Sequence, residues 1–427
     1  MADTPNSLAS FNAMLKLIYP TEIADAVTSV NHLQKRVKFN VEQTGPGLKY
    51  HLPVKMSREQ GSTFSNSDVV TLNASRAPTI QYAELAGSTI AYNSTVTQKL
   101  ITSTATDRQA FERAMDEIMK DVIGSMGKRT ENSIIHGSNG YANASSSTNI
   151  NTTSTTLNCT AAMWAGAMWQ GEKGMPLDLL KTAGTVVINT NAPLVLVSVD
   201  YVNHKLVVSG NATDIAAVDT YCASNTDALV VPFGALGNEM VGLRAIQLNT
   251  SSLFGIDASA YDLWQATQYP ITGALTGSVL NDAVAFAVNK GGLDEEVVAF
   301  VNPTTWARLM DTALTAQRRF DSSYSQSLVK NGAEELVFYS QAGAIEIVAH
   351  PYVFEGDCMI IPLDEVTRVG SSDIILLTNQ GTESNSTGSL LWPITGTLSY
   401  ELRAFTDQAV LIRNPAKSVI ITGIVNS

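Results

Sequence analysis

Five histidines are the side chains best suited to acid–base or metal chemistry near neutral pH. They are His32, His51, His136, His204 and His350. None stands at a recognised catalytic or metal-binding spacing from a Cys, a Ser or a carboxylate. We therefore expect a structural role for each histidine.

A run of three carboxylates, Asp294, Glu295 and Glu296, has the ligand type that binds cations or works as paired carboxylates. It lies in a predicted turn just before an apolar strand. A solvated run is the favoured interpretation, because nothing else in the sequence completes a site around it.

The three cysteines are odd in number, far apart and without the histidine spacing of a zinc site. They are Cys159, Cys222 and Cys358. We expect buried thiols in a protein from a reducing compartment.

Sequence signatures of common enzymes are missing. No GxGxxG follows a predicted strand, and no GxxxxGK[ST], GxSxG or HExxH occurs. The sequence therefore predicts neither an enzyme nor a bound cofactor.

The composition favours some classes of function and argues against others. The chain has 427 residues, a net charge of −12 and only 15% charged residues, against about 25% in ordinary soluble domains. Few charges are typical of subunits whose faces are covered by neighbours, although secreted β-rich proteins share the pattern. The acidic balance argues against a protein that neutralises nucleic-acid phosphates.

One basic strip near the N-terminus is an exception. It consists of Lys35, Arg36, Lys38, Lys49, Lys55 and Arg58. We interpret it as a solvated strip or one that faces other subunits, in preference to a specific DNA-binding site, and any contact with DNA here would be non-specific. The sequence shows no signal peptide and no apolar run of about 18 residues, so we expect synthesis in a cytoplasm and no membrane span.

The N-terminal third is predicted to be largely extended. Residues 1–44 read as an arm with a short helix near residues 12–18. Residues 48–56 alternate between apolar and polar side chains, which predicts a half-buried strand, and Pro53 makes it an edge. With further strands at 69–72 and 79–92, these residues predict a long hairpin that lies across a neighbouring subunit.

The middle of the chain predicts a helix and then a β module. Apolar residues at spacings of three and four predict a helix from Thr106 to about Ile135, weakened at Gly124 and Gly127. The Ser/Thr/Asn-rich stretch 139–160 predicts an exposed loop. Met163, Trp164, Met168 and Trp169 predict a hydrophobic anchor against another domain or subunit.

Short strands at 185–189, 194–199 and 205–209 predict a small all-β module over residues 175–248, inserted into a larger domain.

The rest of the chain, after the module, predicts an α/β layer followed by strands. A helix should span residues 280–288 and end at Gly291 and Gly292. A buried strand at 297–301 should precede a helix that is capped by Asn302. Further strands are predicted at 345–349, 359–361, 398–405, 409–413 and 418–425.

The order of these parts, together with short local motifs, resembles a known family. The motifs are Val301–Trp306 followed by Leu309; Ile345–Val348 leading into His350–Tyr352; Gly356-Asp357 before Ile360–Pro362; Tyr400–Arg403 before Thr406–Ala409; Pro415 to Ile424; and Phe254–Asp257 before Tyr261 and Trp264. The chain is similar to the HK97-fold major capsid proteins of tailed bacteriophages. Most of the chain is covered by this resemblance, and the β module least.

The resemblance implies an α+β, HK97-like capsid fold and its domain organisation. The implied parts are an N-terminal arm (1–44), an E-loop (45–104), the spine helix of a peripheral domain (105–138), a loop with an inserted β-rich module (139–250), peripheral strands (251–271 and 363–427) and an axial domain (272–362). The implied function is a structural, non-enzymatic subunit that self-assembles as hexamers and pentamers of an icosahedral phage head around double-stranded DNA. It would be assembled in the bacterial host cytoplasm and located in the virion.

The resemblance also implies partners. Only about 44 residues precede the hairpin, so a separate scaffolding protein is expected. A portal protein is a further expected partner, and a decoration protein is a candidate. Some relatives cross-link through an E-loop lysine. Here Lys49 and Lys55 lie near the start of the hairpin and no acceptor aligns, so no cross-link is expected. Two alternatives stay open: an encapsulin-like cellular shell protein, and a β-rich tail component or adhesin.

Overall fold

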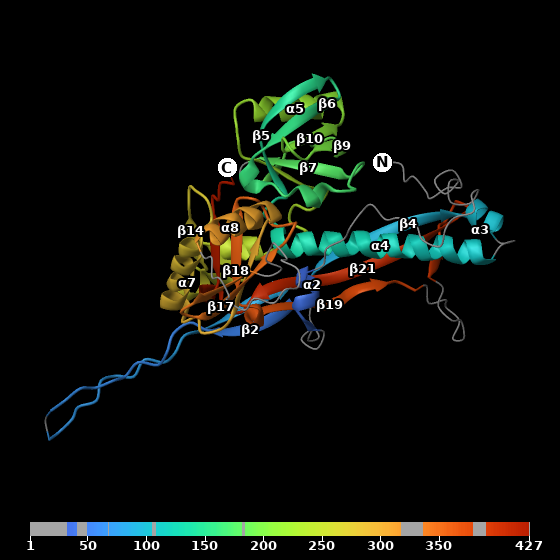
Figure 1. Cartoon of the computed structure of the whole chain (residues 1–427). Coiled ribbons are helices and arrows are strands. Elements are labelled where there is room, and N and C mark those ends of the chain that lie inside the picture. The colour runs from blue at the N-terminus through green and yellow to red at the C-terminus, as the bar shows by residue number, and fades with distance from the viewer. Residues whose placement is uncertain are drawn as a thin grey trace, which may run out of the picture.

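The computed structural model describes residues 32–40, 49–66, 68–104, 108–181, 184–316, 336–378 and 390–426. These residues form a mixed α+β structure with three larger sheets, one long helix and one narrow extension (Figure 1). The expected α+β class is confirmed. The helix expected near residues 12–18 lies outside the described residues.

The longest element is helix α4 (Arg108–His136), which packs along a five-stranded sheet. This sheet contains β1 (Phe39–Asn40), β4 (Ser88–Thr97), β19 (Val366–Leu376), β20 (Leu391–Pro393) and β21 (Ser399–Ile412). Ile118, Val122 and Met126 of α4 share a buried cluster with Val96 of β4 and Leu402 of β21. The predicted helix is confirmed, and neither Gly124 nor Gly127 interrupts it. Short helix α3 (Gln98–Thr104) joins β4 to α4.

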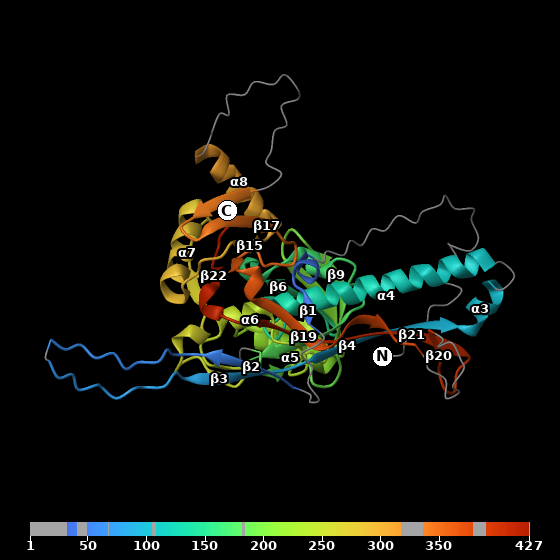
Figure 2. The same ribbon diagram turned by 90° about the horizontal axis from the view of Figure 1, so that it is seen from below.

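A two-stranded ribbon (residues 49–86) leaves this body. Strand β2 (Lys49–Lys55) pairs with β3 (Ile80–Ala86) along its whole length. Beyond this ladder, the described part of residues 57–79, called the projection below, extends away from every other element (Figures 1 and 2). The predicted strand at 69–72 is not formed. The ribbon is also shorter than the predicted hairpin, because β4 leaves it and pairs with residues 399–408 of β21.

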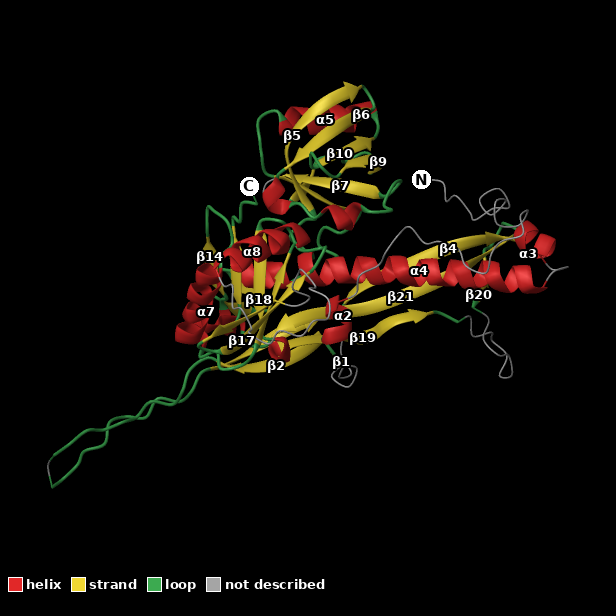
Figure 3. Cartoon of the chain, viewed as in Figure 1, coloured by secondary structure: helices red, strands yellow, loops and turns green. Residues whose placement is uncertain are grey.

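Residues 139–250, called the module, form a lobe beside the C-terminal end of α4 (Figure 3). Its seven-stranded sheet has the order β11-β5-β6-β10-β9-β7-β8. The strands are β5 (Ala142–Asn151), β6 (Ser154–Cys159), β7 (Pro176–Lys181), β8 (Val186–Val187), β9 (Leu194–Asp200), β10 (Lys205–Ser209) and β11 (Ala228–Pro232). Helix α5 (Ala212–Cys222) packs on β5 and β6, and α6 (Leu243–Leu248) leads back to the body.

Two predictions about the module are wrong. The polar stretch 139–160 is not a loop: it forms β5 and β6, in which small residues such as Ala142, Ala144 and Thr155 are buried. The module is also not all-β. Asn211 caps α5 by accepting a hydrogen bond from the Asp214 backbone N–H at 2.8 Å.

A mixed six-stranded sheet forms the remaining layer, in the order β14-β22-β18-β15-β17-β16. These strands are β14 (Thr267–Pro270), β22 (Val419–Thr422), β18 (Asp357–Ile361), β15 (Val297–Val301), β17 (Gly343–Ala349) and β16 (Leu336–Ser340). Helices α7 (Gly277–Gly291) and α8 (Pro303–Ala316) contribute to the hydrophobic core on one face. Gly292 ends α7 in the left-handed conformation with φ 61°, and Asn302 Oδ1 accepts from the Thr304 N–H at 2.9 Å at the start of α8.

The sheets join distant parts of the chain in ways that the sequence did not predict. Strands β14 and β22 belong to the six-stranded sheet, although residues 251–271 and 363–427 were assigned to the peripheral strands. Strand β21 is continuous where two strands, 398–405 and 409–413, were predicted. Thr406 and Gln408 lie buried within it, and a hydrogen bond from Gln408 Nε2 to Thr406 Oγ1 at 3.0 Å lets these polar side chains continue the strand.

Smaller elements complete the described fold. They are β12 (Ser252–Leu253), β13 (Ile256–Asp257), and the 3-10 turns η1 (Ala161–Met163), η2 (Gly166–Trp169), η3 (Asp262–Trp264), η4 (Leu363–Glu365) and η5 (Pro415–Lys417). None of the helices in the described ranges combines the length and hydropathy needed to cross a membrane.

Candidate functional site

The histidines and carboxylates of the described residues lie in several separate places. Across the described ranges, no group of three or more His, Cys, Asp or Glu side chains is arranged to hold a metal ion. His51 lies on the exposed face of the ribbon, and His204 lies 3.8 Å from a Glu355 carboxylate oxygen. His51 Nδ1 also lies 3.8 Å from Glu84 Oε1. His350 Nε2 lies 3.0 Å from Glu131 Oε1, although 219 residues separate these two in sequence.

The acidic run is partly engaged rather than simply solvated. Lys417 Nζ lies 2.5 Å from Glu295 Oε1, 3.4 Å from Asp294 Oδ1 and 3.3 Å from Glu365 Oε1. Burial lowers the pKa of Lys417, but the contacts with Glu295 and Glu365 outweigh this effect and raise it. The lysine comes from η5, more than 100 residues after the acidic run, so this ion-pair cluster has no local sequence signal.

All three cysteines are buried free thiols, as predicted. Burial raises the pKa of Cys159 to about 12 and that of Cys222 to about 11. At neutral pH these thiols are protonated, and so they are poor nucleophiles.

The six basic residues of the predicted contact strip lie in two separate places, and all six are exposed. Lys35, Arg36 and Lys38 lie in or just after helix α2 (His32–Arg36), whereas Lys49, Lys55 and Arg58 lie on or next to β2. Two of them bind within the chain. Arg36 makes a bidentate pair with Glu346 at 2.7 and 3.1 Å, and Lys49 Nζ lies 2.9 Å from Glu84 Oε2.

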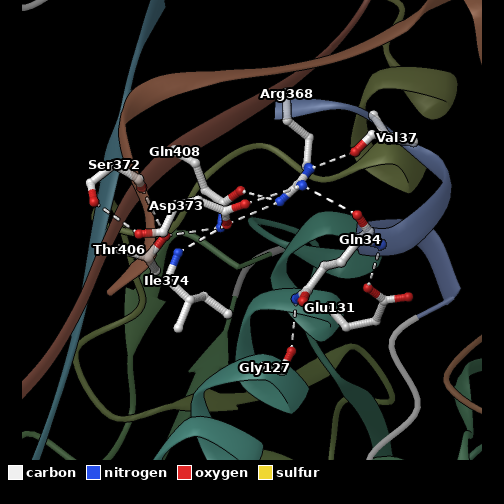
Figure 4. A network of polar contacts seen from close by, with 10 residues as sticks. All are labelled: Gln34, Val37, Gly127, Glu131, Arg368, Ser372, Asp373, Ile374, Thr406 and Gln408. Atoms are coloured by element: carbon white, nitrogen blue, oxygen red, sulfur yellow. Dashed lines mark hydrogen bonds and ion pairs between the residues drawn. The ribbon is translucent and has the colours of Figure 1, made fainter. Parts of the chain in front are cut away.

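The first of these places is residues 32–40, called the anchored segment. Figure 4 shows how Glu131 of α4 holds its beginning. Glu131 Oε1 accepts from the Leu33 backbone N–H at 2.7 Å, and Oε2 accepts from that of Gln34 at 3.1 Å. Glu131 is fully buried, so these bonds satisfy a carboxylate that water does not reach.

Arg368 of β19 holds the other end of the same segment (Figure 4). Its guanidinium donates to the Gln34 carbonyl at 3.2 Å and to the Val37 carbonyl at 3.1 Å. It also donates to Gln408 Oε1 at 3.0 Å. The negative Glu131 therefore binds N–H groups at the start of α2, and the positive Arg368 binds carbonyls at and after its end. Charges placed in this way favour a helical turn, because they oppose the partial charges at its two ends.

The second place is the outer face of the ribbon. Its inner face carries Tyr50, Leu52 and Val54, which pack in a cluster with Trp264. On the outer face, Ile80 and Tyr82 are 52% and 62% exposed. Exposure increases along the projection, where Phe64 is 94%, Val69 83% and Leu72 79% exposed. These exposed apolar side chains lie on a part of the chain that has no core of its own.

The module is tied firmly to α4. Lys128 Nζ lies 2.9 Å from Glu172 Oε1 and donates to the Gln170 carbonyl at 2.5 Å. Burial lowers the pKa of Lys128, although Glu172 opposes this shift. Trp164 is buried, and its carbonyl accepts from the Glu355 N–H at 2.9 Å. The predicted aromatic anchor is thus formed within the chain, between the module and residues 350–357.

The sequence matches no protein-family model and no curated protein. Several solved structures are similar in fold to this chain. A chain of the cyanophage A-1(L) capsid asymmetric unit has a TM-score of 0.53 at 12% identity, over 98% of this chain and 99% of that chain. A chain of the native GTA particle capsid has a TM-score of 0.48 at 8% identity, over 98% and 99%. A Mycobacterium phage Bobi chain has a TM-score of 0.46 at 12% identity, over 99% and 100%. The likeness to the cyanophage capsid chain is one of fold, and it spans nearly all of both chains.

Proposed function

We propose that this chain is a structural shell subunit, namely the major capsid protein of a tailed phage with an HK97-like fold. Copies of the chain would form hexamers and pentamers of an icosahedral head that encloses double-stranded DNA. The ribbon would be the E-loop, α4 the spine helix, and the six-stranded sheet with α7 and α8 the axial domain. The fold likeness to a cyanophage capsid chain supports this proposal.

The observation that carries the proposal is the projection. Phe64, Val69 and Leu72 are exposed on a part of the chain that contacts no core of its own. Burying such side chains is favourable by roughly 1.5–3 kcal/mol each, and only another molecule can supply the burial. A subunit that lies over its neighbour in a lattice would use this energy for assembly.

The exposed basic residues fit the same proposal. Lys35, Lys38, Lys55 and Arg58 would face neighbouring subunits, and the net charge of −12 makes the chain repel DNA except at such local sites. A scaffolding protein, a portal protein and a decoration protein are proposed partners. The proposed location is the virion, after assembly in the host cytoplasm.

Negative-stain microscopy of the overexpressed full chain, with analysis of what the particles contain, tests the proposal. Closed shells, or hexameric and pentameric rings that close when a scaffolding protein is added, are expected. Trimers or fibres would contradict a shell and would instead support a tail component or adhesin. Shells that enclose protein cargo rather than DNA, when purified from infected cells, would favour an encapsulin-like compartment.

A further inference from the structure

Strand β4 is an open edge of the five-stranded sheet (Figure 1). It pairs with β21 over all ten of its residues without a bulge. Among the described residues, no strand pairs with its other side. Helix α4 packs on the face of the sheet, where Val96 of β4 lies in a cluster with Ile118 and Val122. The helix therefore covers one face of β4 and not its outer edge.

The register identifies the backbone groups of β4 that point away from the sheet. The Gln98 N–H donates to the Leu398 carbonyl at 3.0 Å, in the same register that pairs Thr97 with Ser399. Even-numbered residues of β4 therefore bond to β21, and odd-numbered residues direct their N–H and C=O groups outward. Within the described parts of the chain, no backbone group bonds to this outer side. The outward residues are Thr89, Ala91, Asn93, Thr95 and Thr97.

The composition of β4 leaves this edge able to pair. Exposed edges are usually protected from pairing with another chain by a proline, a lysine, a bulge or a short length. Three other edge strands contain a proline, which is Pro270 in β14, Pro393 in β20 and Pro53 in β2. Strand β4 has no proline and no charged residue, and it is rich in β-branched side chains. It is therefore suited to receive a further strand.

We propose that β4 pairs antiparallel with β4 of a second copy of this chain, about a twofold axis at Asn93. Asn93 then lies opposite its own copy, Ala91 opposite Thr95 of the second copy, and Thr89 opposite Thr97. All the outward N–H and C=O groups gain partners in this register. The uncharged strand meets itself without placing like charges opposite each other, whereas a charged segment of another protein would find no complementary charge on it.

This contact would add a second kind of interface to the proposed shell, and its role there rests on the proposed function. A projection that lies over the next subunit makes a head-to-tail contact, and repeated contacts of this kind close a ring. A contact about a twofold axis joins a subunit of one ring to a subunit of another. The pairing itself needs no shell, because two free subunits can form it.

A charge at Asn93 tests for the axis, since only a residue at the axis meets its own copy. Asn93→Lys changes an exposed side chain whose backbone does not bond to β21, so the subunit should keep its fold. Sedimentation of the full chain should show self-association at least about tenfold weaker, because two lysines lie opposite each other. Asn93→Asp should weaken it similarly, and an equimolar mixture of the two variants should restore it. Asn281→Lys, which changes an exposed residue of α7, is the matched control and should associate as the natural chain does.

Three results would overturn the pairing through β4. The natural chain could fail to self-associate, Asn93→Lys could associate as tightly as the natural chain, or the mixture could fail to restore association. Failure of the proposed function would look different. Natural subunits that pair through β4 but never build a shell would contradict the shell and leave the pairing intact.

Cysteine cross-linking reads the register independently. Asn93→Cys should give a disulfide-linked pair of chains with oxidised glutathione, because Cα atoms directly opposite each other in this register lie about 5.5 Å apart. Thr95→Cys, the matched control on the same edge, should not, because its own copy lies roughly 13 Å away along the strands. Equal cross-linking of the two variants would overturn the axis at Asn93.

Discussion

The anchored segment (residues 32–40) and the projection (residues 57–79) are close in sequence but are held in opposite ways. Buried charged groups, Glu131 and Arg368, bind the backbone of the anchored segment, and its Leu33 and Val37 side chains are buried in the hydrophobic core. The projection has exposed apolar side chains such as Phe64 and Leu72. Hydrogen bonds join its two sides, among them the bridge between Gln60 and Arg76 and the bonds from Asn73 to Ser62 and Thr63.

The difference shows which contacts belong to one chain and which require another. A buried charge must be paired inside the folded subunit, so the position of the anchored segment is defined by this chain alone. An exposed apolar side chain gains free energy only when something covers it. Loss of a contact in the anchored segment should therefore weaken folding, whereas loss of one in the projection should weaken association.

The largest expected effect on stability is that of Arg368→Met. This change leaves the carbonyls of Gln34 and Val37 and the Gln408 side chain without their buried donor. We expect a loss of about 3 kcal/mol in the free energy of unfolding, measured by denaturant titration. Arg58→Met, the same substitution next to the ribbon, should change it by less than about 0.5 kcal/mol. Equal losses would remove the distinction between the two regions.

The second prediction concerns pH. Burial, partly offset by the bond to the Tyr352 carbonyl, lowers the pKa of His136 from 6.5 to about 3. The unfolded chain therefore takes up a proton below about pH 6.5 that the folded chain refuses. Stability from this group is complete above that pH and is lost as the pH falls, by about 2 kcal/mol at pH 5.

Unfolding titrations of His136→Gln check this sign. The variant should be less stable than the natural chain at neutral pH, and the gap should narrow as the pH falls towards 5. His51→Gln, on the exposed face of the ribbon, should follow the natural pH dependence. Parallel curves for His136→Gln and the natural chain would contradict the prediction.

The third prediction concerns assembly, with little change in stability. Phe64→Ser combined with Leu72→Ser should change the free energy of unfolding by less than about 0.5 kcal/mol, because both side chains are already exposed. Sedimentation and microscopy should nevertheless show fewer large assemblies. Val202→Ser removes an equally exposed apolar residue from a turn of the module and serves as the control. If it impairs assembly as strongly, the projection has no special role.

The fourth prediction, with the smallest expected effect, concerns the rate at which the cysteine thiols react. Because Cys159, Cys222 and Cys358 are buried and protonated, they should react with a maleimide about 100-fold more slowly than an exposed thiol. Ser62→Cys places such a thiol on the projection and provides the comparison in the same molecule. Fast labelling of the natural chain would show that the module or the six-stranded sheet opens readily.

The sequence predicted those elements whose signals are local. Alternation along Lys49–Lys55, the apolar stripe of α4, Gly292 after α7 and Asn302 before α8 each act within one or two turns of chain. Strand β6 was missed because its buried alternation uses Thr155, Leu157 and Cys159 among polar neighbours, so its composition indicated a loop. In this segment, burial in the folded protein determined the secondary structure, and the polar composition did not.

The anchorage of residues 32–40 could not be predicted in the same way. Leu33 lies 98 residues from Glu131, and Val37 lies 331 residues from Arg368. The spacing of such residues in the sequence does not predict their contact, because the contact depends on how whole sheets pack. The basic strip was predicted to contact other subunits, whereas Arg36 contacts Glu346 of its own chain. One helix signal was available and overlooked: Asn211, followed by Ile215 and Val218 at helical spacing.

Strand β22 has a consequence for how the molecule is made. It lies inside the six-stranded sheet, hydrogen-bonded to β14 on one side and β18 on the other, yet it is the last strand in chain order. While a ribosome is still translating, β14 and β18 have emerged with a gap between them, and each has an unpaired edge. We therefore expect the nascent polypeptide to complete this sheet in one late step. Until residues 419–422 have emerged, these two edges are open to pairing with a polypeptide on a neighbouring ribosome.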